Sequence, residues 1–395
     1  MKKFVALFPI AKSVHVTKEI GLIPYYMHVK YGYEPSIACY GRQNEFPTID
    51  QTPGLSIWTI ERSKTVNVIE KLFYRFVLGS NYMDYLYVAE FIKKNAMTID
   101  VLQVYHVHDE FVGLLSRLYK KYNKKGVLCL KLDLGENTYR ACLERYNERG
   151  FKHIRYRIRL HLLRQYIDIV SVESRKFITG IREIFDKEPL YLPNGCYELK
   201  SVTINEHREN LFLTVANLSE WKGSDLLVEA FAMIYEKCNW NLVLVGPCEN
   251  NVLRRIKDIF KDHPKLERRI IMTGNIVGKR ELYEYYKRAG VFILPSKGEA
   301  FPTVVMEAMY NGCFLVITET VAPKDDIVVD GDEGVIIPPN DKQKLAEVML
   351  RIARGDYSNI INNGKNKIKY QNRFSYNHSL VRLQEQILNV AVKYK

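Results

Sequence analysis

The sequence predicts an α/β protein with two Rossmann-like domains, each built on a doubly wound parallel sheet. Short apolar runs, typical of buried strands, alternate with segments of helical periodicity, and this alternation occurs in both halves of the chain. The 395 residues are enough for two such domains. Apolar residues make up 47% of the chain and charged residues 26%, as in an ordinary soluble globular protein.

In the first half, apolar runs of strand length are separated by longer amphipathic segments. The expected strands are Lys3–Phe8, Pro35–Tyr40, Val101–His106, Gly126–Leu132 and Ile167–Val172. The expected helices are Lys18–Tyr31, an aromatic-rich block at Val66–Lys94, Glu110–Lys121, a basic helix from Arg149 to about Tyr166, and a helix after Glu173.

In the second half of the chain, predicted strands and helices alternate more regularly, which favours a second parallel sheet. The expected strands are Leu211–Val215, Trp240–Val245, Ile270–Thr273, Val291–Leu294, Phe314–Thr318 and Gly334–Ile337. The expected helices lie near residues 224–237, 251–262, 279–289, 302–311 and 341–354.

The loop Leu192-Pro193-Asn194-Gly195 and the charged residues after it mark a domain boundary. We therefore expect an N-terminal domain at residues 1–197 and a C-terminal domain at residues 198–375. Residues 376–395 have the pattern of an amphipathic helix, which we expect to pack back toward the N-terminal domain.

Cysteine usage and hydropathy favour a cytoplasmic protein. The seven cysteines are scattered without a Cys-x-x-Cys motif, and their odd number excludes a complete disulfide framework. Lys2-Lys3 before the apolar run Phe4–Ile10 resembles a signal peptide only faintly, because the run is short and lacks a cleavage site. No segment approaches the length of a membrane span. The cysteines are Cys39, Cys129, Cys142, Cys196, Cys238, Cys248 and Cys313.

The net charge of +13 is concentrated in the first half of the chain. Residues 1–200 hold 31 Lys and Arg against 21 Asp and Glu, a net charge of +10. Part of this charge lies on the helix at residues 149–166, where basic and apolar residues interleave, so this helix is a candidate for contact with an anionic membrane surface. An ordinary helix with one buried stripe and a solvated basic face explains it equally well. No recognition motif for nucleic acid accompanies the charge, so we expect no nucleic-acid partner. The basic residues of this helix include Lys152, Arg155, Arg157, Arg159 and Arg164.

The most informative segment runs from Ser296 to Met309. It follows a buried strand, turns at Gly298, and enters a helix for which Pro302 suits the first position. Glu299 is therefore expected at the carboxyl end of the strand, where open α/β sheets bind ligands, with Glu307 inside the helix. A carboxylate accepts hydrogen bonds from two vicinal hydroxyls, so one glutamate suits a sugar ring and the other a ribose. The free N–H groups that begin the helix suit a pyrophosphate.

This segment resembles the donor-site signature of retaining nucleotide-sugar glycosyltransferases of the GT-B fold, specifically family 4 (glycosyl transferases group 1). That family carries a Glu-x7-Glu motif followed by a Glu-Ala-Met-Ala-x-Gly-like helix, and here Glu299 and Glu307 are followed by Ala308-Met309-Tyr310-Asn311-Gly312. The resemblance implies that Glu299 contacts donor sugar hydroxyls, and that Glu307 contacts the ribose. It also implies that backbone groups border the sugar and phosphates at Ala300, Phe301, Pro302 and Thr303.

Two further loops of the second half complete the expected donor site. The Lys222 side chain can lie along a pyrophosphate, and Gly223 lets the backbone come close to that group. In the resembling family an arginine and a Lys-Gly pair neutralise the diphosphate, and Asn217 stands where the arginine is common. The resemblance places the nucleotide base near Gly274 and Ile276.

The first half departs more from the family pattern. A Gly-Gly turn after the first strand is reduced to one glycine with a nearby lysine, and the histidine expected after a later strand is missing. The acceptor-side candidates are Lys18, Gly21, His106, His108, Lys131 and Asp133.

Metal binding is not expected. Asp330-Gly331-Asp332 resembles a metal-binding Asp-x-Asp, but beside Gly334 it is more typical of a turn. His106 and His108 lack an evident third ligand. The resembling family requires neither metal nor other cofactor, because the nucleotide sugar is a substrate.

The resemblance implies two domains facing a cleft, with the donor on the C-terminal domain and the acceptor on the N-terminal domain. It implies a retaining, metal-independent hexosyltransferase that transfers from a UDP- or GDP-sugar to a glycan or lipid-linked glycan, in bacterial-type polysaccharide assembly. Glu299 and Lys222 are the catalytic candidates, Glu299 by positioning the sugar and Lys222 by meeting phosphate charge. Such an enzyme acts in the cytoplasm, peripherally at the inner face of the membrane. The alternatives are a nucleotide-sugar epimerase of the same architecture and a non-catalytic nucleotide-sugar-binding subunit.

Overall fold

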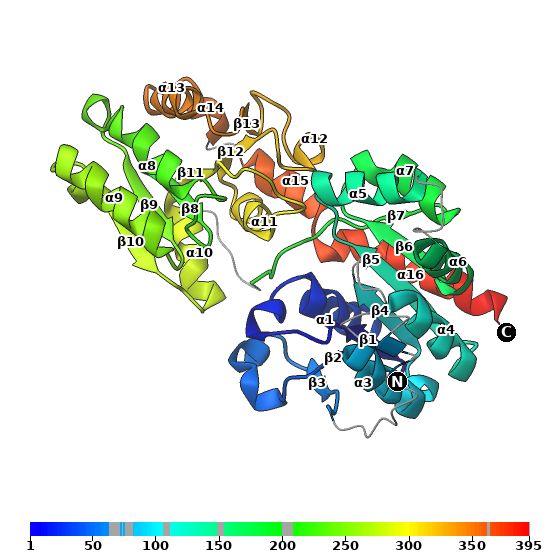
Figure 1. Cartoon of the computed structure of the whole chain (residues 1–395). Coiled ribbons are helices and arrows are strands. Elements are labelled where there is room, and N and C mark those ends of the chain that lie inside the picture. The colour runs from blue at the N-terminus through cyan, green and yellow to red at the C-terminus, as the bar shows by residue number, and fades with distance from the viewer. Residues whose placement is uncertain are drawn as a thin grey trace. The chain divides into compact units, whose positions relative to one another are not determined.

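The chain divides into two compact units (Figure 1). The computed structural model describes residues 1–62, 72, 74–75, 82–105, 111–147, 154–199, 208–361 and 364–394, with only the backbone at 154 and 155. Unit 1 comprises Met1–Pro193 and Tyr376–Lys395, and unit 2 comprises Asn194–Ser375. The chain thus passes between the units at Pro193, against a boundary expected after residue 197.

Unit 1 is built on a seven-stranded parallel sheet in the order β3-β2-β1-β4-β5-β6-β7. All five strands expected in this half are present, and the two unexpected strands are short ones at the sheet edges, β3 and β7. The strands are β1 (Lys3–Leu7), β2 (Glu34–Cys39), β3 (Ser56–Thr59), β4 (Val101–Tyr105), β5 (Val127–Leu132), β6 (Ile169–Val172) and β7 (Leu190–Tyr191).

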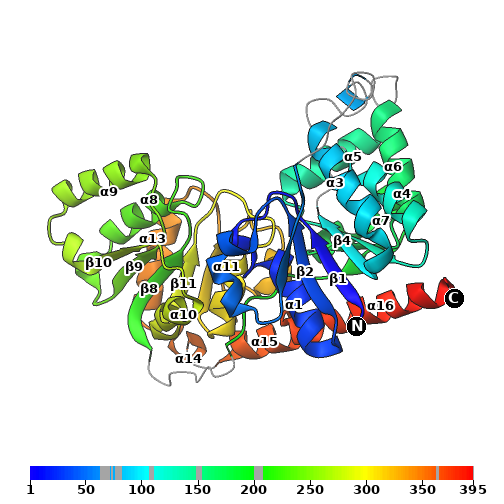
Figure 2. The ribbon, with the colours of Figure 1, turned by 90° about the horizontal axis from the view of Figure 1, so that it is seen from below.

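The helices of unit 1 are α1 (Glu19–Tyr31), α3 (Tyr82–Asn95), α4 (Val112–Tyr122), α5 (Glu136–Asn147), α6 (Ile154–Tyr166), α7 (Ile178–Phe185) and α16 (Tyr376–Lys393). Helix α1 packs on β1 and β2, and α16 lies beside it (Figure 2). Helix α4 packs between α3 and α6. Helix α5 was not predicted, and the early part of the predicted helical block 66–94 falls largely outside the described residues. Short 3₁₀ turns occur in unit 1 at Ser13–His15, Gln43–Glu45, Pro47–Gln51, Ala96–Thr98 and Arg175–Phe177, and in unit 2 at Tyr235–Lys237 and Glu267–Arg269.

Unit 2 contains a six-stranded parallel sheet in the order β10-β9-β8-β11-β12-β13. Each strand corresponds to one expected from the sequence. The strands are β8 (Glu209–Val215), β9 (Asn241–Val245), β10 (Ile270–Gly274), β11 (Ala289–Leu294), β12 (Phe314–Thr318) and β13 (Gly334–Ile337).

Helices cover both faces of this second sheet. One apolar core lies under α8, α9 and α13, and the other under α10, α11 and α15. Successive residues of a strand enter opposite cores, Phe212 the first and Leu213 the second, which explains why the strands read as unbroken apolar runs. The helices are α8 (Ser224–Ala232), α9 (Asn250–Asp262), α10 (Lys279–Arg288), α11 (Thr303–Tyr310), α12 (Lys324–Ile327), α13 (Lys342–Ala353), α14 (Ser358–Ile361) and α15 (Lys365–Arg373).

The order of the strands positions the candidate site. The chain enters the second sheet at its centre with β8, moves outward through β9 and β10, and returns to pair β11 with β8. The loops that follow these two central strands therefore begin side by side at the carboxyl edge. This reversal is the place where open α/β sheets bind their ligands.

A buried ion pair crosses the first sheet at its carboxyl edge. Lys131 on β5 and Glu173 just after β6 are 1% and 3% exposed, and their Nζ and Oε1 atoms are 2.7 Å apart. The Lys131 ammonium also donates to the carbonyl of Leu192 at 3.3 Å. Burial raises the pKa of Glu173, and the Lys131 ammonium opposes that rise. The pair thus ties β5 to β6 and to the chain just before the unit boundary.

Lys131→Met is expected to destabilise unit 1 by about 3–5 kcal/mol, because it strands Glu173 without a counter-charge. The folded variant then favours a protonated Glu173 while the unfolded chain ionises, so its stability falls as pH rises above about 4.3. Urea unfolding across this range measures both effects. Lys261→Met, which breaks the exposed Lys261–Asp258 pair, is the control and should change stability little. A Lys131→Met midpoint equal to that of the control would contradict the structural role.

Candidate functional site

The two loops after β8 and β11 are joined by hydrogen bonds from both backbone and side chains. Lys297 N donates to the Trp221 carbonyl at 2.8 Å, and Trp221 Nε1 donates to the Gly298 carbonyl at 3.0 Å. Beside them, Lys222 Nζ and Glu299 Oε1 are 2.5 Å apart. The structure therefore brings together Lys222 and Glu299, which lie 77 residues apart in the sequence.

Two glycines make this close approach of the loops possible. Gly223 has φ +66°, and a Cβ there would lie 2.3 Å from the carbonyl oxygen of Pro295. A Cβ on Gly298 would lie 3.1 Å from the Trp221 ring. Any side chain at Gly223 would both adopt a strained backbone conformation and push the two loops apart.

The turn that carries Glu299 is also held from β12 and the residues after it. Glu299 N donates to the Thr320 carbonyl at 3.3 Å, and Ala322 N donates to the Glu299 carbonyl at 3.0 Å. The Ser296 carbonyl accepts from the hydroxyls of Thr318 and Thr320 at 2.7 and 3.0 Å. The carboxylate of Glu299 thus projects from a turn fixed on two sides, and its side chain is 11% exposed.

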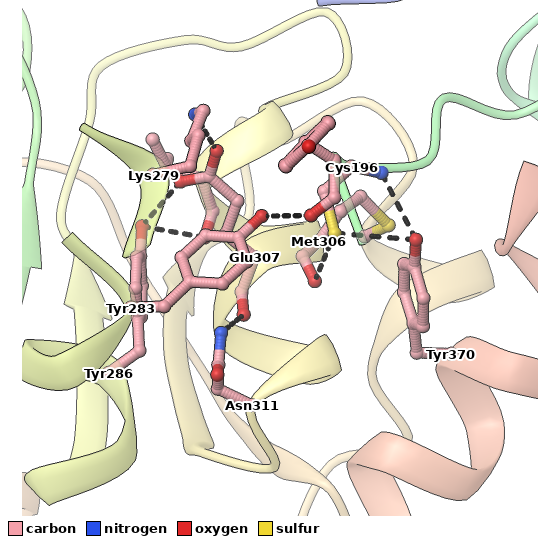
Figure 3. Close-up of polar contacts among 10 residues, drawn as sticks. Cys196, Lys279, Tyr283, Tyr286, Met306, Glu307, Asn311 and Tyr370 are labelled. Atoms are coloured by element: carbon pink, nitrogen blue, oxygen red, sulfur yellow. Dashed lines mark hydrogen bonds and ion pairs between the residues drawn. The ribbon is translucent and has the colours of Figure 1, made fainter. Parts of the chain in front are cut away.

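Glu307 lies on the buried side of α11, where two groups of α10 hold its carboxylate (Figure 3). The Lys279 ammonium forms an ion pair with Oε1, and the Tyr286 hydroxyl donates to Oε2 at 3.1 Å. Glu307 is 1% exposed, whereas the Lys279 side chain is 15% exposed. Burial and the neighbouring Glu307 carboxylate raise the pKa of Tyr286, so this phenol keeps its proton and acts as a donor. Glu307 is therefore fixed but retains unused lone pairs.

Helix α11 is also anchored to the start of unit 2 (Figure 3). Cys196 N donates to the Tyr370 hydroxyl at 3.1 Å, and Cys196 Sγ lies 3.7 Å from the Met306 carbonyl. The Tyr283 hydroxyl donates to the carbonyl of Tyr197. Met306 belongs to α11, Tyr370 to α15 and Tyr283 to α10, so these contacts tie three helices around Glu307 to the segment where the chain enters unit 2.

The first turn of α11 differs slightly from expectation. Helix α11 begins at Thr303, and Pro302 is the N-cap residue with φ −74° and ψ 108°, so Pro302 is not the first helical residue. Val305 N donates back to the Pro302 carbonyl at 3.0 Å. Ala300 precedes Phe301, which is buried against the Phe374 ring. The earliest N–H groups of the helix have no intrahelical acceptor.

The loop expected near the nucleotide base follows β10. Gly274 has φ +71°, and its carbonyl accepts from Gly246 N at 2.9 Å, which fixes the end of β10 beside β9. Ile276 packs partly against the core under α10 and α11. Asn217, at the position of the missing arginine, donates to Glu249 at 3.4 Å.

The acceptor-side candidates of unit 1 have different environments. Lys18 is the N-cap residue of α1, and Gly21 is buried within that helix, where a Cβ would lie 2.2 Å from the Val16 carbonyl oxygen. Lys131 is buried and pairs with Glu173, whereas Asp133 is half-buried. Burial and the Asp133 carboxylate raise the pKa of the neighbouring Glu19. His106 and His108 lie outside the described residues.

Sequence reasoning missed Trp221, Lys279 and Tyr286. Lys279 and Tyr286 lie seven residues apart, so they share a face of α10, and this spacing was the available signal. Their shared partner on α11 could not be read from the chain. Among the described residues, no group of three or more His, Cys, Asp or Glu side chains could hold a metal ion. No helix in these same parts of the chain has the length and apolarity to cross a membrane.

Solved structures share this architecture along the whole chain. Sucrose-phosphate synthase from Thermosynechococcus elongatus matches with a TM-score of 0.70 and 16% identity, covering 100% of both chains. The Anabaena protein HepE, in complex with UDP and glucose, matches with a TM-score of 0.67 and 14% identity over 98% of this chain and 99% of that one. The chain has the GT-B fold. Residues 198–367, which include every GT-B donor-side candidate above, match the family described as Glycosyl transferases group 1.

Several sequence relatives are named as glycosyltransferases of bacterial glycan synthesis. A Campylobacter jejuni α-1,4-N-acetyl-D-galactosaminyltransferase, named for an undecaprenol-linked substrate, is 22% identical over 62% of this chain and 67% of that protein. Other relatives are named for colanic acid and amylovoran biosynthesis. The chain spans only 13 to 23% of the length of the first three curated relatives.

Gly223→Ala is expected to destabilise unit 2, because its Cβ meets the Pro295 carbonyl in addition to the left-handed strain of about 1–2 kcal/mol. Gly331→Ala is the matched control, since Gly331 has φ +79° and a Cβ added there would have no atom within 4 Å. Thermal unfolding should show a clearly larger loss for Gly223→Ala. Equal losses would mean that only the backbone conformation, and not the contact between the loops, matters.

Proposed function

We propose that this protein is a retaining glycosyltransferase that moves a sugar from a UDP- or GDP-sugar to a glycan or lipid-linked glycan during bacterial polysaccharide assembly. The observation that supports it most is the Lys222–Glu299 pair at the junction of β8 and β11, next to the first turn of α11. The match of residues 198–367 to Glycosyl transferases group 1, and the UDP bound by the structurally similar HepE, agree with this proposal.

In this proposal the Lys222–Glu299 pair receives the sugar diphosphate. Glu299 uses one oxygen for Lys222, so its other lone pairs are available to donor sugar hydroxyls. Lys222 has three N–H donors and uses one for Glu299, so it can also meet a phosphate oxygen. The amides that open α11 add positive potential beside both groups. Glu299 acts by positioning the sugar, and Lys222 by stabilising charge.

Lys279 has a related role in this proposal. It supplies a counter-charge to the buried carboxylate of Glu307, whose remaining lone pairs can accept the two ribose hydroxyls. Because Lys279 follows the loop at Gly274 and Ile276, its remaining N–H groups are well placed for the nucleotide itself. Tyr286 fixes the second carboxylate oxygen and keeps the acceptor geometry rigid.

The proposed transfer retains anomeric configuration without a covalent sugar–protein intermediate. The bond from the anomeric carbon to the diphosphate breaks, and the acceptor hydroxyl attacks from the same face. The leaving phosphate takes the hydroxyl proton, while Lys222 and the α11 amides stabilise its developing charge. The acceptor binds to unit 1 near Asp133 and Lys18, and the enzyme works in the cytoplasm at the membrane surface.

Two alternatives share the donor site. An epimerase would return a new nucleotide sugar, and a non-catalytic subunit would bind without turnover. Asn217 favours the non-catalytic subunit, because a neutral amide in place of the arginine supplies no positive charge to the diphosphate. The family named for residues 198–367 favours transfer.

Incubation with a panel of UDP- and GDP-sugars tests the function. We expect slow release of free nucleotide with one donor, faster with the correct acceptor, and an α-linked product from an α-linked donor by NMR. The reaction should continue in excess EDTA, since lysine and helix amides can meet the phosphates. An epimerised donor, or tight binding without release, would favour an alternative. Loss of activity in EDTA that manganese restores would overturn metal independence.

Donor-site variants separate binding from turnover. Lys222→Ala and Glu307→Ala are each expected to weaken nucleotide binding by about ten-fold or more, as each removes a charge-assisted contact. Glu299→Ala should lower kcat more than it weakens binding of the free nucleotide, because it contacts the sugar. Calorimetric titration and steady-state kinetics measure both. Lys324→Ala, which removes a partly exposed lysine of α12, is the control. Unchanged nucleotide affinity in the first two variants would contradict this donor site.

A further inference from the structure

Helix α6 combines a buried apolar side with basic residues on the rest of its surface. Its buried side is apolar, with Leu160, Leu162 and Leu163 each less than 10% exposed. Arg157 and His161 lie one turn apart on the exposed side. Arg164 follows His161 by three residues, so these three basic side chains lie along one side of the helix, with Arg164 partly buried.

Arg164 is held in place by the end of α7. Its Nε donates to the Ile184 carbonyl at 2.8 Å, and Nη2 donates to the Glu183 carbonyl at 3.1 Å. The guanidinium also lies over the Tyr146 ring, 5.7 Å from its centroid. These neutral partners fix the group without cancelling its charge, and they leave the N–H groups of Nη1 unused.

A polar hollow of about 370 Å³ opens between the end of α5 and the middle of α6. No Asp or Glu is among the described residues that line it. Arg157 and His161 make no hydrogen bond or ion pair within the described parts of the chain. Tyr156 Oη, at the wall, is buried and likewise has no hydrogen-bond partner there. The lining residues are Tyr146, Asn147, Tyr156, Arg157, Leu160, His161 and Arg164.

From this arrangement we propose that the hollow binds a phosphate group, as a phosphate ester or diphosphate. Two guanidiniums, an imidazole and the Asn147 amide offer hydrogen-bond donors around one space, and the described part of its lining contains no competing carboxylate. Planar guanidiniums match the geometry of phosphate oxygens, and charge-assisted bonds of this kind are among the strongest that side chains make. One of these guanidiniums is already fixed, so less side-chain freedom is lost on binding.

Two kinds of molecule carry such a phosphate group, a lipid with a phosphate headgroup and a soluble phosphate ester. The hollow lies on unit 1, built from helices other than those that carry the donor-side residues of unit 2, so this inference does not rest on the proposed donor site. A lipid phosphate would hold the protein at a membrane surface. A soluble phosphate ester would occupy the hollow without such attachment.

The test removes the two unpaired cationic or basic side chains while keeping polar groups of similar size. Arg157→Gln/His161→Gln leaves Arg164 and its contacts with α7 intact. Arg117→Gln/His378→Gln is the matched control, because it makes the same chemical changes at exposed positions of unit 1 outside the lining. Each protein is titrated with pyrophosphate and with glycerol 3-phosphate, and is co-sedimented with phosphatidylcholine vesicles containing none, 10% or 30% phosphatidate. UDP affinity is measured on the same proteins.

We expect the pocket variant to bind the soluble phosphates at least about ten-fold more weakly than the control, with equal UDP affinity in both. A parallel loss of vesicle binding in the pocket variant alone identifies a lipid phosphate. Vesicle binding that is equal in both variants identifies a soluble ester. If soluble phosphates and vesicles bind equally to the two variants, the proposal is overturned, whatever the outcome at the donor site. Far-UV circular dichroism checks that both variants are folded.

Discussion

The pairing of β8 with β11 at the centre of the second sheet is the constraint on which the candidate site depends. Helices cover both faces of this sheet, so the loops at its carboxyl edge carry the polar groups. Because the strand order reverses between these neighbours, the loop with Trp221 and Lys222 meets the loop with Gly298 and Glu299. The hydrogen bonds between the loops, the glycine at 223 and the ion pair beside them are all consequences of that adjacency.

Lysine–glutamate pairs recur at the carboxyl edges of both sheets, and their burial distinguishes their roles. Lys131 and Glu173 are both almost fully buried, so their pairing offsets the cost of desolvation and holds strands together. Lys279 is partly exposed above a buried Glu307, and Lys222 is more exposed still above Glu299. In these two pairs the lysine faces outward with unused N–H groups. One type of interaction thus ties strands together in unit 1, and in unit 2 it leaves lysine N–H groups available to the ligand of the proposed donor site.

Local contacts also determine where the basic side chains of helix α6 in unit 1 lie. Arg164 is positioned by backbone carbonyls, which fix its guanidinium while leaving it charged. Arg157 and His161 line the same hollow from the preceding turns of α6. A charge count along the helix cannot distinguish such convergence from a uniformly solvated face, because it ignores which side of the helix is buried.

The sequence by itself determined both parallel sheets, all six strands of unit 2, and the strand–turn–helix segment with Glu299 and Glu307, because apolar periodicity and glycine or proline turns are local signals. The resemblance to the family also implied that Lys222 belongs with these glutamates. The edge strands β3 and β7 and helix α5 escaped prediction because they are short or weakly apolar. Only the tertiary structure decided that Lys279 and Tyr286 hold Glu307, that Lys131 is an internal counter-charge, and that Pro302 caps α11. Each of these contacts depends on which helices and strands the sheet order places next to each other. Residues far apart in the sequence cannot be paired from the local pattern of apolar and turn residues.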